Sequence, residues 1–177
     1  MGQDDTKHNL LFISKYPQII HEFTDAMKDR DIEIETAING IEAAAKIKKK
    51  NYDIVITGLS LEGYNGEQII TYLNKTAPST VCIIYTTTIS SAQLHFFINE
   101  RNVFRVFLRP VDFRGAFWEA LEEAYEYHAV QVKNEEDTGA RRQEQEKQER
   151  EIEIMDQRMR SQRQARETTN RYMKRLA

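Results

Sequence analysis

The chain has 177 residues, which is enough for one globular domain of ordinary size and an additional segment. Its 25 basic and 28 acidic residues give a net charge of −3, unlike the strongly basic balance of a typical nucleic-acid-binding protein. No apolar run approaches the roughly 18 residues of a membrane span, and the polar N-terminus does not resemble a secretion signal. A single cysteine allows no internal disulfide. We therefore expect a cytoplasmic protein.

Apolar residues are concentrated in residues 1–132, where two periodicities alternate along the chain. Continuous apolar runs and one alternating segment predict five strands, at residues 9–14, 32–37, 53–57, 80–86 and 104–108. Apolar residues at helical spacing follow each strand, and the first helix is expected to begin near Pro17. Five strands alternating with five helices predict an α/β fold, with a doubly wound parallel sheet covered by helices on both faces.

In folds of this class the functional site lies beyond the carboxyl ends of the strands. The residues expected there are Ser14, Lys15, Gly58, Thr86, Thr87 and Arg109. No glycine-rich phosphate loop opens a helix, so no nucleotide site and no cofactor are expected.

Three segments carry a resemblance to a known family. "YDIVITGLSLEGYNGEQI", "CIIYTT" and "VFLRP" resemble the third, fourth and fifth strands of a response-regulator receiver domain of the chemotaxis-regulator type, over residues 9 to about 130. The longer segment "INERNVFRVFLRPVDF" resembles receivers that precede phosphodiesterase or cyclase outputs. The resemblance implies the flavodoxin-like receiver fold and a role in two-component signalling.

The resemblance also implies a phosphorylation site, but most of its residues are replaced. The family uses a carboxylate after the third strand as phosphoryl acceptor, and this chain has Gly58 there. The acidic pair that would bind Mg²⁺ is Ser14 and Lys15, and the lysine of the fifth strand is Arg109, whereas the hydroxyl of Thr86 is retained. We therefore expect a pseudo-receiver that signals independently of phosphorylation and is not an enzyme.

The replaced site is open to two interpretations. Lys15 and Arg109, together with Thr86 and Thr87, are candidates for an anion-binding site. Alternatively, Lys15 points into solvent and Arg109 pairs with Glu62.

No metal site is predicted. The four histidines are scattered without ligand spacing, and we expect surface or helix-face positions for them: His8, His21, His95 and His128. Cys82 lies in an apolar run, which is typical of a buried structural thiol.

After residue 132 the sequence becomes almost wholly polar, with 12 basic and 10 acidic residues. The expected domains are a pseudo-receiver at 1–132, a linker at 133–143 with a joint at Thr138 and Gly139, and a helical tail at 144–177. The tail has a heptad seam that suggests a coiled coil, formed by Ile152, Met155, Met159, Met173 and Leu176. Gln162, Arg166 and Thr169 interrupt the seam, so a lone solvated helix or a disordered extension is the alternative.

The leading functional hypothesis is a signalling module that acts through protein–protein interaction. We expect it to form a homodimer through the face of the fourth helix, fifth strand and fifth helix. The aromatic candidates for this interface are Phe96, Phe97, Phe113, Phe117, Trp118 and Tyr125, most of them expected in the core and one or two exposed. One rival is the regulatory N-terminal part of a longer enzyme, such as a cyclic-dinucleotide phosphodiesterase. The other is an RNA-binding regulator that uses the tail arginines, disfavoured because acidic residues are interleaved with them.

Overall fold

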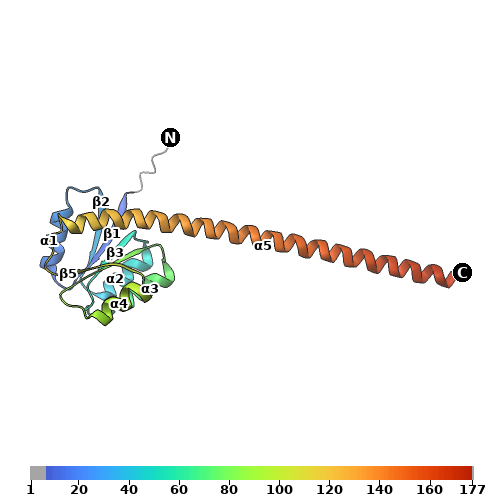
Figure 1. The fold of residues 1–177 in the computed structure, drawn as a ribbon, viewed down its shortest axis with the longest axis horizontal. Helices are drawn as coiled ribbons and strands as arrows, with labels where there is room; N and C mark the ends of the chain where they lie inside the picture. Colours follow the sequence, from blue (N-terminus) through green and yellow to red (C-terminus); the bar gives the residue numbers. More distant parts are fainter. Residues whose placement is uncertain (1–6, 177) are drawn as a thin grey trace. The chain divides into compact units, whose positions relative to one another are not determined.

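The computed structural model describes residues 7–176, apart from the side chains of residues 170 and 172–176. Within this part of the chain, five strands and five helices alternate (Figure 1). The strands are β1 (His8–Ile13), β2 (Ile32–Ala37), β3 (Ile54–Thr57), β4 (Val81–Thr86) and β5 (Val103–Leu108). The helices are α1 (Pro17–Met27), α2 (Gly40–Lys49), α3 (Gly66–Thr76), α4 (Ser91–Glu100) and α5 (Ala116–Leu176).

The five strands form one parallel sheet in the order β2-β1-β3-β4-β5. The strand order reverses at β1, which pairs with β2 on one side and β3 on the other. The connection after β1 leads to β2 on one side, and the connection after β3 leads to β4 on the other side. The carboxyl ends of β1 and β3 therefore border a crevice. The fold class predicted from the sequence is confirmed, and each predicted strand boundary lies within one residue of the observed one.

Each face of the sheet has its own hydrophobic core. On one face α1 and α5 pack on alternate strand residues, and the largest buried side chains there include Phe12, Phe23 and Phe117. On the other face α2, α3 and α4 pack on the remaining strand residues, with Ile70, Leu73 and Phe97 among the buried side chains. The central strands are buried on both faces, which explains why they appear in the sequence as continuous apolar runs.

Cys82 belongs to the second core and is almost completely buried. Burial raises the pKa of its thiol to about 12, so the thiolate is not populated at neutral pH. Cys82 is therefore the buried structural thiol expected from its apolar surroundings in the sequence.

The chain divides into two compact units, residues 1–132 and 133–177. Helix α5 contributes its residues up to 132 to the first unit and residues 133–176 to the second. Residues 133–143, for which the sequence suggested a linker with a joint at Thr138 and Gly139, are helical. The Thr138 hydroxyl donates to the carbonyl oxygen of Asn134, 2.7 Å away, and the flanking residues are good helix formers that offset the roughly 1 kcal/mol cost of one glycine.

In the second unit every described side chain from residue 133 to 169 is exposed. Ile152, Met155 and Met159 are each more than half exposed, so the heptad seam has no partner within the described chain. The side chains of Met173 and Leu176 lie outside the described residues. The coiled coil stays a prediction, and no helix in the described part of the protein is long and apolar enough to cross a membrane.

Most of the predicted interface aromatics are core residues. Phe97, Phe113, Phe117 and Tyr125 are each less than 8% exposed, because Phe97 packs in the core beneath α4 and the other three pack in the core beneath α5. Phe96 and Trp118 are half-buried, and each ring lies under a guanidinium group, that of Arg101 and Arg30 respectively. These positions therefore supply at most two partly accessible rings.

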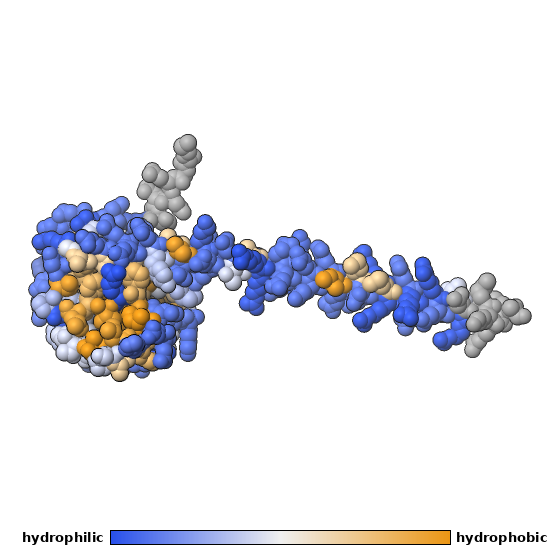
Figure 2. Space-filling view, in the orientation of Figure 1, coloured by the Kyte–Doolittle hydropathy of each residue, from blue (hydrophilic) through white to orange (hydrophobic). Residues whose placement is uncertain are grey.

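Other apolar side chains are exposed where the interface was expected. They are Leu94 and Ile98 on α4, Leu108 on β5, and Tyr127 and Val130 on α5, between 39% and 55% exposed. We call these five residues the α4–β5–α5 face. Figure 2 shows apolar side chains gathered over β5 and α4 of the first unit, with a strongly hydrophilic group in the middle of the patch.

Candidate functional site

The six residues that sequence topology placed at the carboxyl ends of the strands line one cavity. Ser14 and Lys15 follow β1, Gly58 follows β3, Thr86 ends β4 and is followed by Thr87, and Arg109 follows β5. Together they line a cavity with a volume of about 250 Å³. The cavity is also lined by residues that the sequence reasoning did not single out: Tyr16, Leu59, Ser60, Leu61 and Tyr85.

Backbone hydrogen bonds fix the loops that form this cavity. The Gly58 N–H donates to the Ile13 carbonyl oxygen at 3.1 Å, which extends the β1–β3 pairing by one residue. Gly66 at the start of α3 donates to the carbonyl oxygen of Leu59, and Gly40 at the start of α2 donates to that of Glu62. The segment between Gly58 and Gly66 is therefore held between two helix N-termini.

The cavity has none of the carboxylates that phosphoryl transfer requires. Gly58 has no side chain, and the Ser14 hydroxyl oxygen accepts a hydrogen bond from the backbone N–H of Tyr16 at 3.3 Å. No Asp or Glu lines the cavity, and no cluster of three metal-binding side chains occurs among the described residues. A phosphoryl acceptor and the hard oxygen ligands preferred by Mg²⁺ are both missing from these lining side chains.

The two cations of the cavity both face the ring of Tyr16. The Lys15 Nζ lies 5.4 Å from the ring centroid and donates to the hydroxyl oxygen of Ser60 at 3.3 Å. The Arg109 guanidinium lies 4.5 Å from the Tyr16 centroid and 5.7 Å from that of Tyr85. Its Nε is buried without a hydrogen-bond partner among the described residues.

The pairing of Arg109 with Glu62, considered as an alternative from the sequence, does not occur in the described part of the structure. No carboxylate lies within 4.0 Å of the Arg109 guanidinium or of the Lys15 ammonium there. Other cations of the first unit do have such a partner, among them Lys28, Lys46, Lys50, Arg101, Arg105 and Arg114.

The electrostatic effect of the two cations is visible at Tyr16. The Arg109 guanidinium, and after it the Lys15 ammonium, lower the pKa of the Tyr16 phenol from its ordinary value. Both effects favour a negative charge at that oxygen. The mouth of the cavity is therefore a region of positive potential in a domain whose overall charge is acidic.

The threonines at the end of β4 differ in accessibility. Thr86 is 9% exposed, and its hydroxyl donates to the carbonyl oxygen of Thr88 at 3.4 Å. Its own carbonyl oxygen accepts a hydrogen bond from the Arg109 N–H at 2.8 Å, which ties the start of the Arg109 loop to β4. Thr87 is exposed and lines the cavity at the surface.

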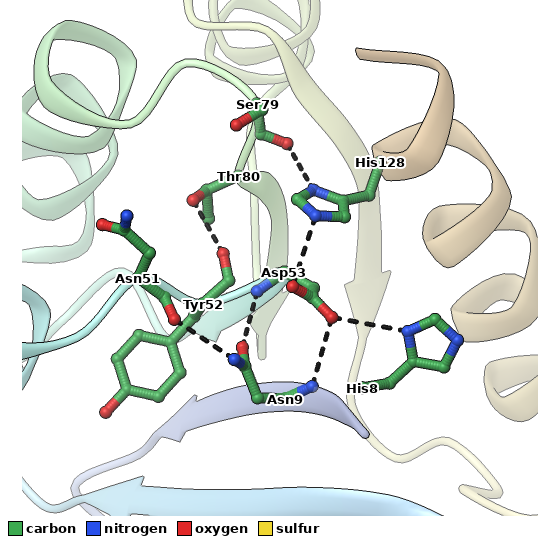
Figure 3. A network of polar contacts seen from close by, with 8 residues as sticks. All are labelled: His8, Asn9, Asn51, Tyr52, Asp53, Ser79, Thr80 and His128. Atoms are coloured by element: carbon green, nitrogen blue, oxygen red, sulfur yellow. Dashed lines mark hydrogen bonds and ion pairs between the residues drawn. The ribbon is translucent and has the colours of Figure 1, made fainter. Parts of the chain in front are cut away.

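A second polar cluster lies at the opposite ends of the strands, where β1 and β3 begin, around the carboxylate of Asp53 (Figure 3). One carboxylate oxygen accepts from the Asn9 N–H at 3.2 Å and lies 3.4 Å from the His8 Nδ1. The other lies 3.2 Å from the Nε2 of His128 on α5. The Asp53 side chain, 24% exposed, thus joins β1, β3 and α5.

His128 is placed between two hydrogen-bond acceptors. Its Nδ1 lies 2.8 Å from the Ser79 carbonyl oxygen, and its Nε2 faces the Asp53 carboxylate. A carbonyl and a carboxylate can only accept, so both contacts are hydrogen bonds only when both ring nitrogens carry a proton. His8 and His128 were expected as scattered side chains, whereas the structure brings both to the carboxylate of Asp53.

We expect Asp53→Asn to lower the free energy of unfolding by about 2 kcal/mol at pH 7, because it removes an acceptor of charge-assisted hydrogen bonds. Burial by itself would raise the pKa of Asp53, but hydrogen bonds from His128, Asn9 and His8 outweigh it and hold the pKa below its ordinary value of 3.8. The contribution of the carboxylate is therefore fully present above the unfolded-state pKa and is lost as the pH falls through the lower folded-state pKa.

Urea unfolding of the wild type and the variant at pH 7 and at pH 3 measures this contribution, and the difference between the two proteins should shrink at the lower pH. Asp29→Asn is the matched control, because Asp29 is exposed and has no ion pair among the described residues. A pH-independent difference between wild type and Asp53→Asn would show that the Asp53 carboxylate is not held in its ionised form by this cluster.

A family model described as the response regulator receiver domain matches residues 11–115. No curated protein matches the chain significantly in sequence.

Solved structures with the same fold are numerous. The signal receiver domain of an HD domain-containing protein from Pseudomonas fluorescens Pf-5 is 19% identical, with a TM-score of 0.66 over 70% of this chain and 98% of that one. A CheY-like receiver domain protein from Methanospirillum hungatei JF-1 is 18% identical, with a TM-score of 0.64 over 71% and 99%. An adenylate cyclase from Rhodopirellula baltica is 20% identical, with a TM-score of 0.67 over 73% and 96%.

Proposed function

The chain belongs to the response regulator receiver family, and from this premise we propose that it is a signalling module whose output does not depend on phosphorylation of its own site. One observation carries the proposal: the cavity where a receiver would accept a phosphoryl group is lined by Gly58, Ser14 and Lys15 and by no carboxylate. In this proposal the chain is cytoplasmic, performs no catalysis itself, and transmits its signal by binding another protein.

Incubation with acetyl phosphate and Mg²⁺ tests the proposal, because a receiver with an intact site takes a phosphoryl group from such a donor. We expect the intact mass of the chain to remain unchanged, since Gly58 offers no oxygen for an acyl phosphate. A receiver domain that keeps its acceptor aspartate is the positive control. Gain of the mass of one phosphoryl group, on any residue of the cavity, would contradict the proposal.

The interaction partner that we propose is a second copy of this chain. The α4–β5–α5 face supports this choice, because apolar side chains are gathered over β5 and α4 and the five apolar residues of the face are exposed. Arg105 on β5 also forms an ion pair with Glu123 on α5. Contiguous exposed apolar surface of this kind marks interaction sites on otherwise monomeric domains. The uncovered seam of Ile152, Met155 and Met159 in the second unit provides a separate surface on which two chains can pair.

We expect light scattering to give the full chain twice its 20.8 kDa mass. Leu108→Glu should shift this mass toward the monomer, because a charge would be buried in an apolar interface. The matched control is Ile41→Glu on α2, since Ile41 is 62% exposed and Leu108 is 52% exposed, but Ile41 lies outside the face. A dimer that tolerates Leu108→Glu but not Met155→Glu would assign dimerisation to the second unit. A wild-type chain that is monomeric would contradict the proposed homodimer.

A second candidate is a regulatory part within a longer signalling enzyme. It is favoured by two of the structural neighbours, which are named as an HD domain-containing protein and an adenylate cyclase. The helical residues after 132 would then connect the receiver to an output domain. The mass of the protein purified from its native source decides between the two, because a mass well above 20.8 kDa would favour the longer enzyme.

A further inference from the structure

The cavity at the carboxyl ends of the strands has unsatisfied positive charge. Lys15 and Arg109 both lie beside the ring of Tyr16, at 5.4 Å and 4.5 Å from its centroid. Their charges are therefore no farther apart than about 10 Å, which is about one Debye length at 0.1 M salt. Two like charges held at this separation without a counter-charge destabilise the site, and an anion between them would relieve the repulsion.

The hydrogen-bond donors of the cavity are also incompletely used. The buried Nε of Arg109 has no acceptor among the described residues. The hydroxyl oxygens of Ser14 and Ser60 each accept a hydrogen bond, so their hydroxyl hydrogens remain able to donate to a ligand. Lys15 donates to the neutral hydroxyl of Ser60, and no carboxylate among the described residues accepts from its ammonium, which has three hydrogens to donate.

The size of the cavity restricts the class of ligand. Its volume of about 250 Å³ is below the roughly 300–1,000 Å³ typical of sites for drug-sized molecules. A dinucleotide is therefore too large, whereas a tetrahedral oxyanion with a small substituent fits. An oxyanion with several acceptor oxygens matches a guanidinium, an ammonium and neighbouring hydroxyls better than a halide does.

We propose that this cavity binds a phosphate group non-covalently, as inorganic phosphate or a small phosphomonoester, with Lys15 and Arg109 as its counter-charges. The site would then respond to a phosphate ligand directly instead of accepting a phosphoryl group. Phosphate binding is independent of the proposed interaction role. A titration that shows no phosphate binding would leave the light-scattering masses that test the α4–β5–α5 face unchanged.

Calorimetric titration of the full chain with inorganic phosphate at pH 8 tests the proposal, with chloride replaced to keep the ionic strength constant. We expect saturable binding of one phosphate per chain and a rise in the melting temperature. Lys15→Gln should weaken binding about tenfold, the effect expected for loss of one charge-assisted contact. Lys15 is exposed, so this variant is expected to fold.

Lys75→Gln is the matched control, because it removes the same charge from an exposed lysine on α3 outside the cavity. Absence of saturable binding, or equal weakening by Lys15→Gln and Lys75→Gln, would overturn the proposal. Glycerol phosphate in a parallel titration identifies the ligand. Equal affinity for both compounds would assign the site to the phosphate group alone, and tighter binding of glycerol phosphate would assign it to a phosphomonoester.

Discussion

Gly58→Asp is expected to weaken phosphate binding by at least about tenfold and still not to create a phosphorylation site. The position has room for a Cβ, because one built on Gly58 would meet no heavy atom closer than 3.7 Å. A carboxylate placed there would supply Lys15 and Arg109 with the counter-charge that they lack and would repel a phosphate dianion. The phosphate titration and the acetyl phosphate incubation described above measure the two effects.

Phosphoryl transfer should not appear in this variant, because a single carboxylate does not provide a Mg²⁺ site. The residues after β1 would still be Ser14 and Lys15, which add one hydroxyl and a positive charge. Gly58→Asn is the control of equal size without charge, and it should keep phosphate affinity within about threefold of the wild type. Equal losses in both variants would show that the cavity excludes any side chain at this position. A phosphorylated Gly58→Asp chain would show that Ser14 and Lys15 are compatible with the reaction.

The fold was predictable because the strands are buried on both faces. Both sides of β3 and β4 carry apolar residues, and four of these have no exposed surface: Ile54, Val55, Ile56 and Ile83. Such a continuous apolar run can be recognised in the sequence without knowing which residues face which side of the sheet. The cavity was predictable for a related reason, since parallel strands place their following residues at one edge of the sheet. The lining residues Tyr16 and Ser60 were missed because they belong to loops, where side-chain direction depends on turn geometry that the sequence pattern does not specify.

Periodicity explains why most of the candidate interface aromatics lie in the core. Phe113, Phe117, Leu121 and Ala124 are separated by four, four and three residues, which is the spacing of a buried helical stripe, and all four are buried. The exposed apolar residues of α5 in the first unit, Tyr127 and Val130, lie farther along the helix than these positions. The helical spacing of these residues therefore predicts which side chains of this segment are buried.

The Asp53 cluster was not predicted at all, because its members are distant in the chain. His8 and Asn9 begin β1 and Asp53 immediately precedes β3, and β1 and β3 are adjacent. Neighbouring parallel strands bring their starting residues together, so this part of the cluster follows from topology. The contribution of His128 required the packing of α5 on the sheet, for which the sequence gives no spacing rule.

The largest effect on stability is expected from Gly40→Ala, which should lower the free energy of unfolding by about 3 kcal/mol. Gly40 begins α2, and its N–H donates to the Glu62 carbonyl oxygen at 2.9 Å. A Cβ at this position would overlap the backbone of Tyr64, in the segment that lies between β3 and α3. Backbone atoms cannot rotate away as a side chain can, so either α2 or this segment must move.

Urea unfolding of the wild type, Gly40→Ala and Gly58→Ala measures the cost of that movement. Gly58→Ala is the control, because it adds the same methyl group where the nearest heavy atom is 3.7 Å away, and its effect should stay within about 1 kcal/mol. The displaced segment contains Ser60, the hydrogen-bond acceptor of Lys15, so Gly40→Ala should also weaken phosphate binding at temperatures where it remains folded. If Gly40→Ala is as stable as the wild type, α2 does not pack against the backbone of Tyr64. The segment that carries Ser60 would then not be held by α2 in the position that brings Ser60 to Lys15.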